Sequence, residues 1–301
     1  MSIDTLQMKI RKLKNPSMLT LSPSPEWVPP YLQEEKLQAM GQTPQALAAA
    51  YEAFCTGILN ALADSVPAVM FQAAAFHALG APGTQSLQNL SQYAAQKGYY
   101  VLFDAMYGDI STQALFEGIS LGNAVYRPYA ADAVAVNAYA GSDSIKPFLP
   151  YCKKAGKNLF VQVRTYNKSA YEVQELLSGD RVVYTAVADI AERWSSGLVG
   201  NLGYSEVAIM AGISDADALR RLRNTYEKLF ILVTGYGAPR VSCGNTQYAF
   251  DQLGRGAIVA DTGTIATAWK KAGTDGRDFR EQAKQAAQRM KDDISKFVVI
   301  R

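Results

Sequence analysis

The stretch 99-YYVLFDAMYGDIST-112 is the part of the chain that best indicates how it folds. It opens with a continuous apolar run that ends in a carboxylate, Asp104, and a second carboxylate, Asp109, follows on the next turn of chain. A short run that is apolar throughout is typical of a strand buried on both faces, as in a parallel sheet. The stretch therefore predicts a buried parallel strand with two acidic side chains beyond its carboxyl end.

Seven further runs of the same kind recur along the chain, and each ends in a polar or small residue. They cover residues 17–22, 68–72, 133–137, 159–164, 206–211, 229–234 and 256–261. Strands that alternate with helices in this way predict an α/β fold of the (β/α)8 barrel type, the TIM barrel. An open, doubly wound sheet is the alternative, and it is less favoured because no GxGxxG motif follows a strand.

The segments between these runs have helical patterns. We expect one barrel domain over residues 1–301, with an N-terminal helix over about 1–14 and a C-terminal helix over about 277–297. Further helices are expected over 44–65, over 84–98 with Thr84 as its cap, and over 214–228 with Ser214 as its cap. The polar segment 166–183 is expected to form a loop over the mouth of the barrel.

Composition narrows the class of protein. Of the 301 residues 49% are apolar, and the net charge of +3 is too small to indicate a nucleic-acid partner or an acidic membrane surface. The three cysteines are odd in number and widely spaced, which favours free thiols in a reducing compartment. No secretory signal and no run long enough to span a membrane is seen, so we expect a cytoplasmic protein.

Barrel enzymes carry their chemistry at the carboxyl ends of the strands. Glycines at 235 and 237 in 235-GYGAPR-240 could bring backbone N–H groups to a phosphate, although the same residues also suit a plain turn. The acidic pair is thin support for Mg²⁺, and no histidine or cysteine cluster predicts a transition metal. The single histidine, His77, lies in a helical pattern, so no catalytic triad is expected.

Six motifs at these strands resemble one family. They are 14-KNPSMLTLSP-23, 67-PAVMFQ-72, 103-FDAMYGDI-110, 136-VNAYAGSDSIKPFL-149, 233-VTGYGAPRV-241 and 256-GAIVADTG-263. Together they are similar to the longer bacterial class of orotidine 5′-phosphate decarboxylases, over about residues 1–295. The resemblance implies a barrel that needs no cofactor and no metal, forms a homodimer, and makes uridine monophosphate in pyrimidine biosynthesis.

The resemblance also implies a catalytic Lys-Asp-Lys-Asp network. Its aspartates fall on Asp104 and Asp109, and the second of them serves the partner subunit's site, whereas its lysines fall on Met70 and Met106. The substrate-binding residues implied in this way are Ser22, Gln72, Thr112, Asn137, Thr165 and Asn167. The phosphate-binding residues are Gly235, Tyr236, Gly237, Ala238, Arg240 and Gly263. Of these, Ser22 replaces an aspartate and Gly263 replaces the arginine that grips the phosphate.

These replacements predict a catalytically impaired decarboxylase, a pseudoenzyme. Methionine cannot donate the proton that the carbanion needs after loss of CO2. A genuine but slow decarboxylase is the alternative, with Arg164 or Arg240 as a substitute cation. The chain could also complete the site of an active paralogue in a heterodimer, act as a different lyase or isomerase, or be an engineered variant. The expected ligand is a pyrimidine nucleotide monophosphate.

Overall fold

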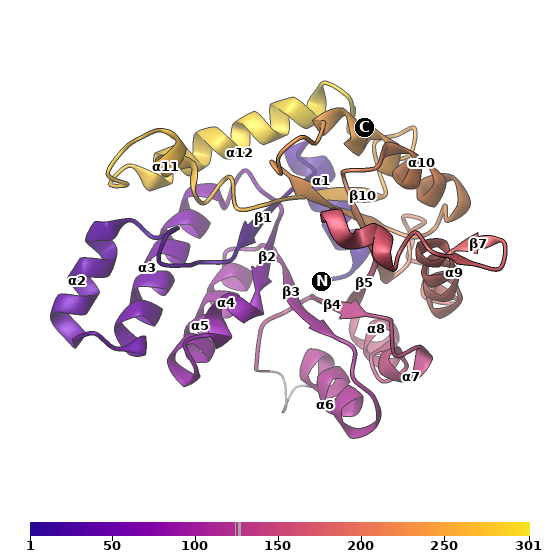
Figure 1. Ribbon diagram of the computed structural model, residues 1–301, viewed down its shortest axis with the longest axis horizontal. Helices are drawn as coiled ribbons and strands as arrows, with labels where there is room; N and C mark the ends of the chain where they lie inside the picture. The colour runs from indigo at the N-terminus through magenta and orange to yellow at the C-terminus, as the bar shows by residue number, and fades with distance from the viewer. Residues whose placement is uncertain (124, 126–127) are drawn as a thin grey trace.

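Eight parallel strands close into a barrel in the order β1-β10-β9-β8-β5-β4-β3-β2, with helices around the outside (Figure 1). This computed structural model describes residues 1–123, 125 and 128–301. The predicted (β/α)8 fold is confirmed. The barrel strands are β1 Ser17–Leu21, β2 Ala68–Gln72, β3 Tyr100–Tyr107, β4 Ala133–Asn137, β5 Asn158–Arg164, β8 Val207–Gly212, β9 Ile231–Tyr236 and β10 Ala257–Asp261.

The helices before β4 are α1 Ile3–Leu13, α2 Pro30–Met40, α3 Pro44–Leu62, α4 Ala73–His77, α5 Ala81–Gln96 and α6 Ser111–Gly122. Those after it are α7 Ser142–Ile145, α8 Leu149–Ala155, α9 Val183–Ser195, α10 Ala216–Thr225, α11 Ala268–Lys271 and α12 Phe279–Ser295. The 3-10 helix η1 (Lys168–Glu172) and the hairpin β6 (Leu177–Ser178) and β7 (Arg181–Val182) occupy the polar segment after β5, and η2 (Cys243–Ala249) follows β9. No helix in the described part of the chain is both long and apolar enough to cross a membrane.

Two helix starts were predicted wrongly. Helix α5 begins at Ala81, before Thr84, because Pro82 in its first turn suits a helix start, and the Thr84 hydroxyl donates back to the Gly80 carbonyl. Helix α10 is capped by Asp215, whose side chain accepts from the Ala218 N–H, rather than by Ser214.

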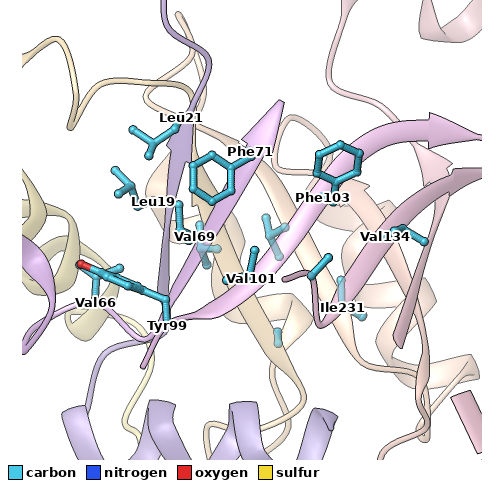
Figure 2. Packing of buried hydrophobic residues seen from close by; sticks show 14 of the residues in the cluster. Leu19, Leu21, Val66, Val69, Phe71, Tyr99, Val101, Phe103, Val134 and Ile231 are labelled. Atoms are coloured by element: carbon cyan, nitrogen blue, oxygen red, sulfur yellow. The ribbon is translucent and has the colours of Figure 1, made fainter. Parts of the chain in front are cut away.

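Alternation along the strands separates two apolar layers. On β1 to β3, Leu19, Leu21, Val69, Phe71, Val101 and Phe103 face the surrounding helices (Figure 2). The residues between them, such as Met18, Met70 and Leu102, face the barrel axis and form the inner core. Successive side chains of a strand point to opposite faces, so every second residue points into the barrel. This series of inward residues continues up to the mouth.

The N-terminal helix closes the opposite end of the barrel. Ile3, Leu6 and Ile10 of α1 are buried within the inner core cluster. Ser2 caps the helix, since its side chain accepts from the Thr5 N–H, and Glu206 attaches the helix to the barrel by accepting from the Ile3 N–H at 3.0 Å. Solvent therefore reaches the barrel interior from the carboxyl ends of the strands.

Arg223 joins the chain segments that enter β9 and β10. Its buried guanidinium donates to the carbonyls of Tyr226, Glu227, Leu229, Ala249 and Gly256, at 2.6 to 3.4 Å. Five carbonyls around one planar fork are a geometry that only arginine satisfies.

We predict that Arg223→Lys lowers the free energy of unfolding by about 2–4 kcal/mol, because an ammonium group leaves several buried carbonyls without a donor. Urea unfolding measures the loss. The matched control is Arg221→Lys, at an exposed arginine of the same helix, which should change stability by less than about 0.5 kcal/mol. Equal stability of the two variants would contradict the role of Arg223.

Candidate functional site

A cavity of about 240 Å³ lies at the carboxyl ends of the strands. Its walls combine hydroxyl, amide, carboxyl and thioether groups with two aromatic rings. The lining residues are Thr20, Ser22, Trp27, Met70, Gln72, Asp104, Met106, Gln162, Thr165, Tyr166, Met210, Thr234, Gly235, Ala260, Asp261 and Thr262. No lysine, arginine or histidine occurs among the described residues that line it.

The barrel register explains most of this lining. Met70 and Gln72 of β2 are inward positions, and their neighbours across the sheet are Leu102 and Asp104 of β3. Gln162 of β5 is inward by the same alternation, and it pairs with Met210 of β8. The cavity is thus the uppermost inward layer of the barrel, above an inner core that apolar side chains fill.

Asp104 is the carboxylate at the centre of the predicted site. Its Oδ2 accepts a hydrogen bond from Gln72 Nε2 at 3.3 Å, whereas its buried Oδ1 has no partner. Burial raises the pKa of Asp104 above its ordinary value, and the Gln72 hydrogen bond opposes the shift. The carboxylate therefore lacks the cation that would normally accompany it at such a depth.

Met106 lies where β3 departs from regular pairing. The β3–β4 register shifts between Asp104 and Tyr107, and Met106 has a φ of +49°, a left-handed conformation that is uncommon for a residue other than glycine. The bulge turns this side chain toward the cavity, although it remains 36% exposed. Met70, by contrast, is 4% exposed and belongs to the inner core.

Asp261 is a second, fully enclosed carboxylate on the cavity wall. It accepts from the N–H groups of Thr20 at 2.7 Å and Ile265 at 3.0 Å, and from the Thr264 hydroxyl at 3.3 Å. Burial raises the pKa of Asp261 to about 6, and these hydrogen bonds oppose the shift. Both carboxylate oxygens accept hydrogen bonds from donors of the same chain, so its role is to join the ends of β1 and β10.

Gly263, where the resemblance places a phosphate-gripping arginine, lies under the Trp27 ring. A Cβ at Gly263 would come within 2.0 Å of Trp27, and its φ of +85° disfavours any other residue. Trp27 is held there because its carbonyl accepts from Trp269 Nε1 at 3.0 Å. The position can therefore hold no long side chain while Trp27 keeps its place.

The other predicted phosphate-binding residues do not lie together in one cavity. Gly235 lines the mouth cavity, but Tyr236, Gly237 and Ala238 line a separate cavity of about 340 Å³ outside the barrel. Arg240 is exposed and lines neither of them.

The predicted substrate and catalytic residues also divide. Ser22, Gln72, Thr165 and Asp104 line the mouth, as do Met70 and Met106. The others are exposed and lie outside it: Thr112, Asn137, Asn167 and Asp109. The Asp109 carboxylate accepts from the N–H of Ile110 at 2.7 Å, and it is absent from the described lining of the cavity that Asp104 lines. The assignment of all these residues to ligand binding stays a prediction.

Arg164 does not enter the mouth, contrary to the idea that it substitutes for a missing lysine. Its guanidinium donates to Glu175 at 2.7 Å and to Asp215 at 2.8 Å and lies against the Tyr184 ring. The carboxylates of Glu175 and Asp215 thus hold the Arg164 guanidinium outside the mouth cavity.

Sequence reasoning left more than half of the lining unassigned. The residues not assigned to the site are Thr20, Trp27, Gln162, Tyr166, Met210, Thr234, Ala260, Asp261 and Thr262. Strict alternation back from the end of each strand finds Thr20, Gln162, Met210, Thr234 and Ala260, since each is an inward position. No sequence signal identifies Trp27, which reaches the cavity from the loop after β1.

The described residues show no cluster of metal ligands and no histidine in the mouth cavity. Within the described residues, no three His, Cys, Asp or Glu side chains gather as metal ligands would. His77 ends α4 and is exposed, outside the mouth cavity.

We predict that Asp261 makes stability depend on pH. Because its pKa of about 6 in the folded state lies above the ordinary 3.8, the folded protein binds the proton more tightly, and stability falls as pH rises from about 4 to about 6. The shift corresponds to roughly 2–3 kcal/mol. Asp261→Asn, whatever its stability at low pH, should lose this fall in urea unfolding. The exposed Asp143→Asn should keep it, and curves for Asp261→Asn parallel to the wild type would refute the assignment.

Known proteins resemble this chain in both sequence and fold. The chain is 32% identical over 245 residues to an orotidine 5′-phosphate decarboxylase of Caldicellulosiruptor saccharolyticus, covering 79% of each chain. It is 33% identical over 229 residues to that of Rhodopirellula baltica, covering 75% of this chain and 76% of the other. No family model matches.

Solved structures agree with these relatives. The OMP decarboxylase of Leishmania donovani superposes with a TM-score of 0.74 at 26% identity, over 98% of this chain and 99% of that one. The identity to the bacterial relatives, over three quarters or more of both chains, is what establishes kinship. The chain belongs to the orotidine 5′-phosphate decarboxylase family.

Proposed function

We propose that this chain is a catalytically impaired member of its family, which keeps the barrel and a binding cavity but has lost the decarboxylation chemistry. The observation that carries the proposal is the buried Asp104 carboxylate with no cation beside it in the described cavity. The two positions that the resemblance assigns to lysines are held by Met70 and Met106.

Charge balance argues against decarboxylation in this cavity. Loss of CO2 leaves a carbanion, which must be stabilised by a positive group and then protonated. Here the new negative charge would develop next to Asp104, with thioethers in place of ammonium groups, so the transition state would be destabilised relative to water. The absent general acid alone lowers a rate by roughly 10²–10⁴.

The binding of an anionic ligand is weakened as well. A phosphate group at the carboxyl ends of β9 and β10 would meet Gly263 and the ring of Trp27 instead of a guanidinium. Pro239, next to the glycine-rich turn, has no N–H to donate. A pyrimidine nucleotide monophosphate would thus bind this chain far more weakly than it binds an enzyme with a complete charge set.

We predict no turnover of orotidine 5′-phosphate in an absorbance assay at high protein concentration, with a rate at least about 10⁴-fold below that of an active family enzyme assayed in parallel. A measurable rate that disappears in Asp104→Ala would instead support a slow, rewired decarboxylase. A rate that survives in Asp104→Ala would be traced to a contaminating enzyme.

We also propose that a second copy of the chain covers the face beside the mouth, with an active paralogue as the alternative partner. Helix α6 leaves Leu115 and Phe116 exposed, and Ile110 before it is exposed too. Met106, near the end of β3, and Tyr139, after β4, are exposed as well, and we call this set of side chains the α6 face. Exposed apolar side chains that form a contiguous surface are typical of a protein interface. The exposed Asp109 begins the same segment, where a partner's cavity could receive it.

The α6 face should fail to dimerise when it carries a charge. We predict that Phe116→Asp weakens self-association by roughly thirtyfold or more, measured by analytical ultracentrifugation, because a buried aromatic anchor is replaced by a carboxylate. Met40→Asp, at an exposed methionine of α2, is the matched control and should associate like the wild type. A wild-type chain that stays monomeric at micromolar concentration would refute the homodimer. Exclusive homodimers on co-expression with an active paralogue would end the heterodimer alternative.

A further inference from the structure

The mouth cavity has the opposite charge character from a site for an anionic substrate. It holds two carboxyl groups, Asp104 and Asp261, and the described residues around it contribute no cationic side chain. Asp261 is saturated by donors of its own chain, but Asp104 Oδ1 is buried without a partner. An unsatisfied buried acceptor is costly, so a ligand that donates a hydrogen bond to Oδ1 gains the energy that the free protein forgoes.

The remaining walls suit an aromatic body with a positive end. Trp27 covers Gly263, and the Tyr166 ring lies against Gly235, where a Cβ would approach it to 3.0 Å. Electron-rich ring faces attract cations, most strongly for tryptophan. Met70, Met106 and Met210 supply apolar, deformable surface between the rings and the carboxylate. The volume of about 240 Å³ limits the ligand to a small molecule.

Anionic and neutral ligands gain less in this cavity. An anion would lose its hydration opposite a buried carboxylate, and no described side chain there would compensate it. A neutral molecule can donate to Asp104 but leaves the negative charge of the carboxylate unbalanced. An organic ammonium ion donates a hydrogen bond to the unpartnered Asp104 Oδ1 and balances the charge of the carboxylate.

We propose that the mouth cavity binds a small organic ammonium ion with an aromatic or apolar body, its N–H groups donating to Asp104 Oδ1. This inference rests on the proposed function in one respect, because a site that still processed an anionic nucleotide would not favour cations. The ammonium group takes the place that a protein cation would otherwise occupy beside Asp104.

A charge series on one molecular frame tests the proposal. Benzylammonium, benzyl alcohol and benzyl phosphate are titrated into the full-length wild-type protein by calorimetry at neutral pH. We expect benzylammonium to bind at least about tenfold more tightly than benzyl alcohol, and benzyl phosphate to bind most weakly. No benzylammonium binding at millimolar ligand, equal affinities, or a preference for the phosphate would overturn the proposal.

Variants then locate the contact. Asp104→Asn keeps the shape of the side chain and should weaken benzylammonium about tenfold, while benzyl alcohol binding changes little. Glu172→Gln removes the same charge from the exposed η1 helix, outside the cavity, and should leave both affinities unchanged. Thermal unfolding checks that both proteins are folded. If Asp104→Asn then binds benzylammonium as tightly as the wild type does, the contact is refuted. The orotidine 5′-phosphate assay is a separate readout, so turnover would refute the proposed function whatever the amine result.

Discussion

Closure of the barrel between its last and first strands is the constraint on which the site depends. The β1–β10 ladder pairs Ser17 and Met18 with Val259 and Ala260. Above it, the Asp261 carboxylate accepts the Thr20 N–H, and the Thr20 hydroxyl donates to the Asp261 carbonyl at 2.6 Å. A buried carboxyl group thus continues the pairing at the mouth, and the ends of all eight strands meet around one cavity.

The same closure gives the cavity its chemistry. Inward positions from strands far apart in the chain form one layer, so the character of the site is the sum of single residues on different strands. Methionines occupy two of these positions and a glycine lies under Trp27, so the lining of the cavity is acidic and apolar. The proposed loss of decarboxylation, the proposed weak binding of anions and the proposed preference for cations all rest on this one charge balance.

Particular residues show how far the sequence could be interpreted. The eight strands were predicted with ends within about two residues, since each is a buried apolar run bounded by polar residues. Helix starts at Ala81 and Ala216 were misplaced because several neighbouring residues suit a cap equally well. Asp104 was assigned to the site as a strand-end carboxylate. Asp261 ends the predicted run 256–261 in the same way but was given no role, because the sequence does not show which hydrogen bonds a carboxyl group makes. Trp27 lies in a loop and carries no periodic signal.

The amino-acid sequence by itself determined the barrel, the family resemblance and the methionines at positions 70 and 106, because strand patterns and residue identities are local properties of the chain. Only the tertiary structure decided that Arg164 is held by Glu175 and Asp215, that Trp27 lies over Gly263, and that Asp109 is exposed and outside the described lining of the cavity that Asp104 lines. These facts depend on which distant segments the closed barrel brings into contact. Side-chain direction and charge pairing are set by that contact and not by position along the chain.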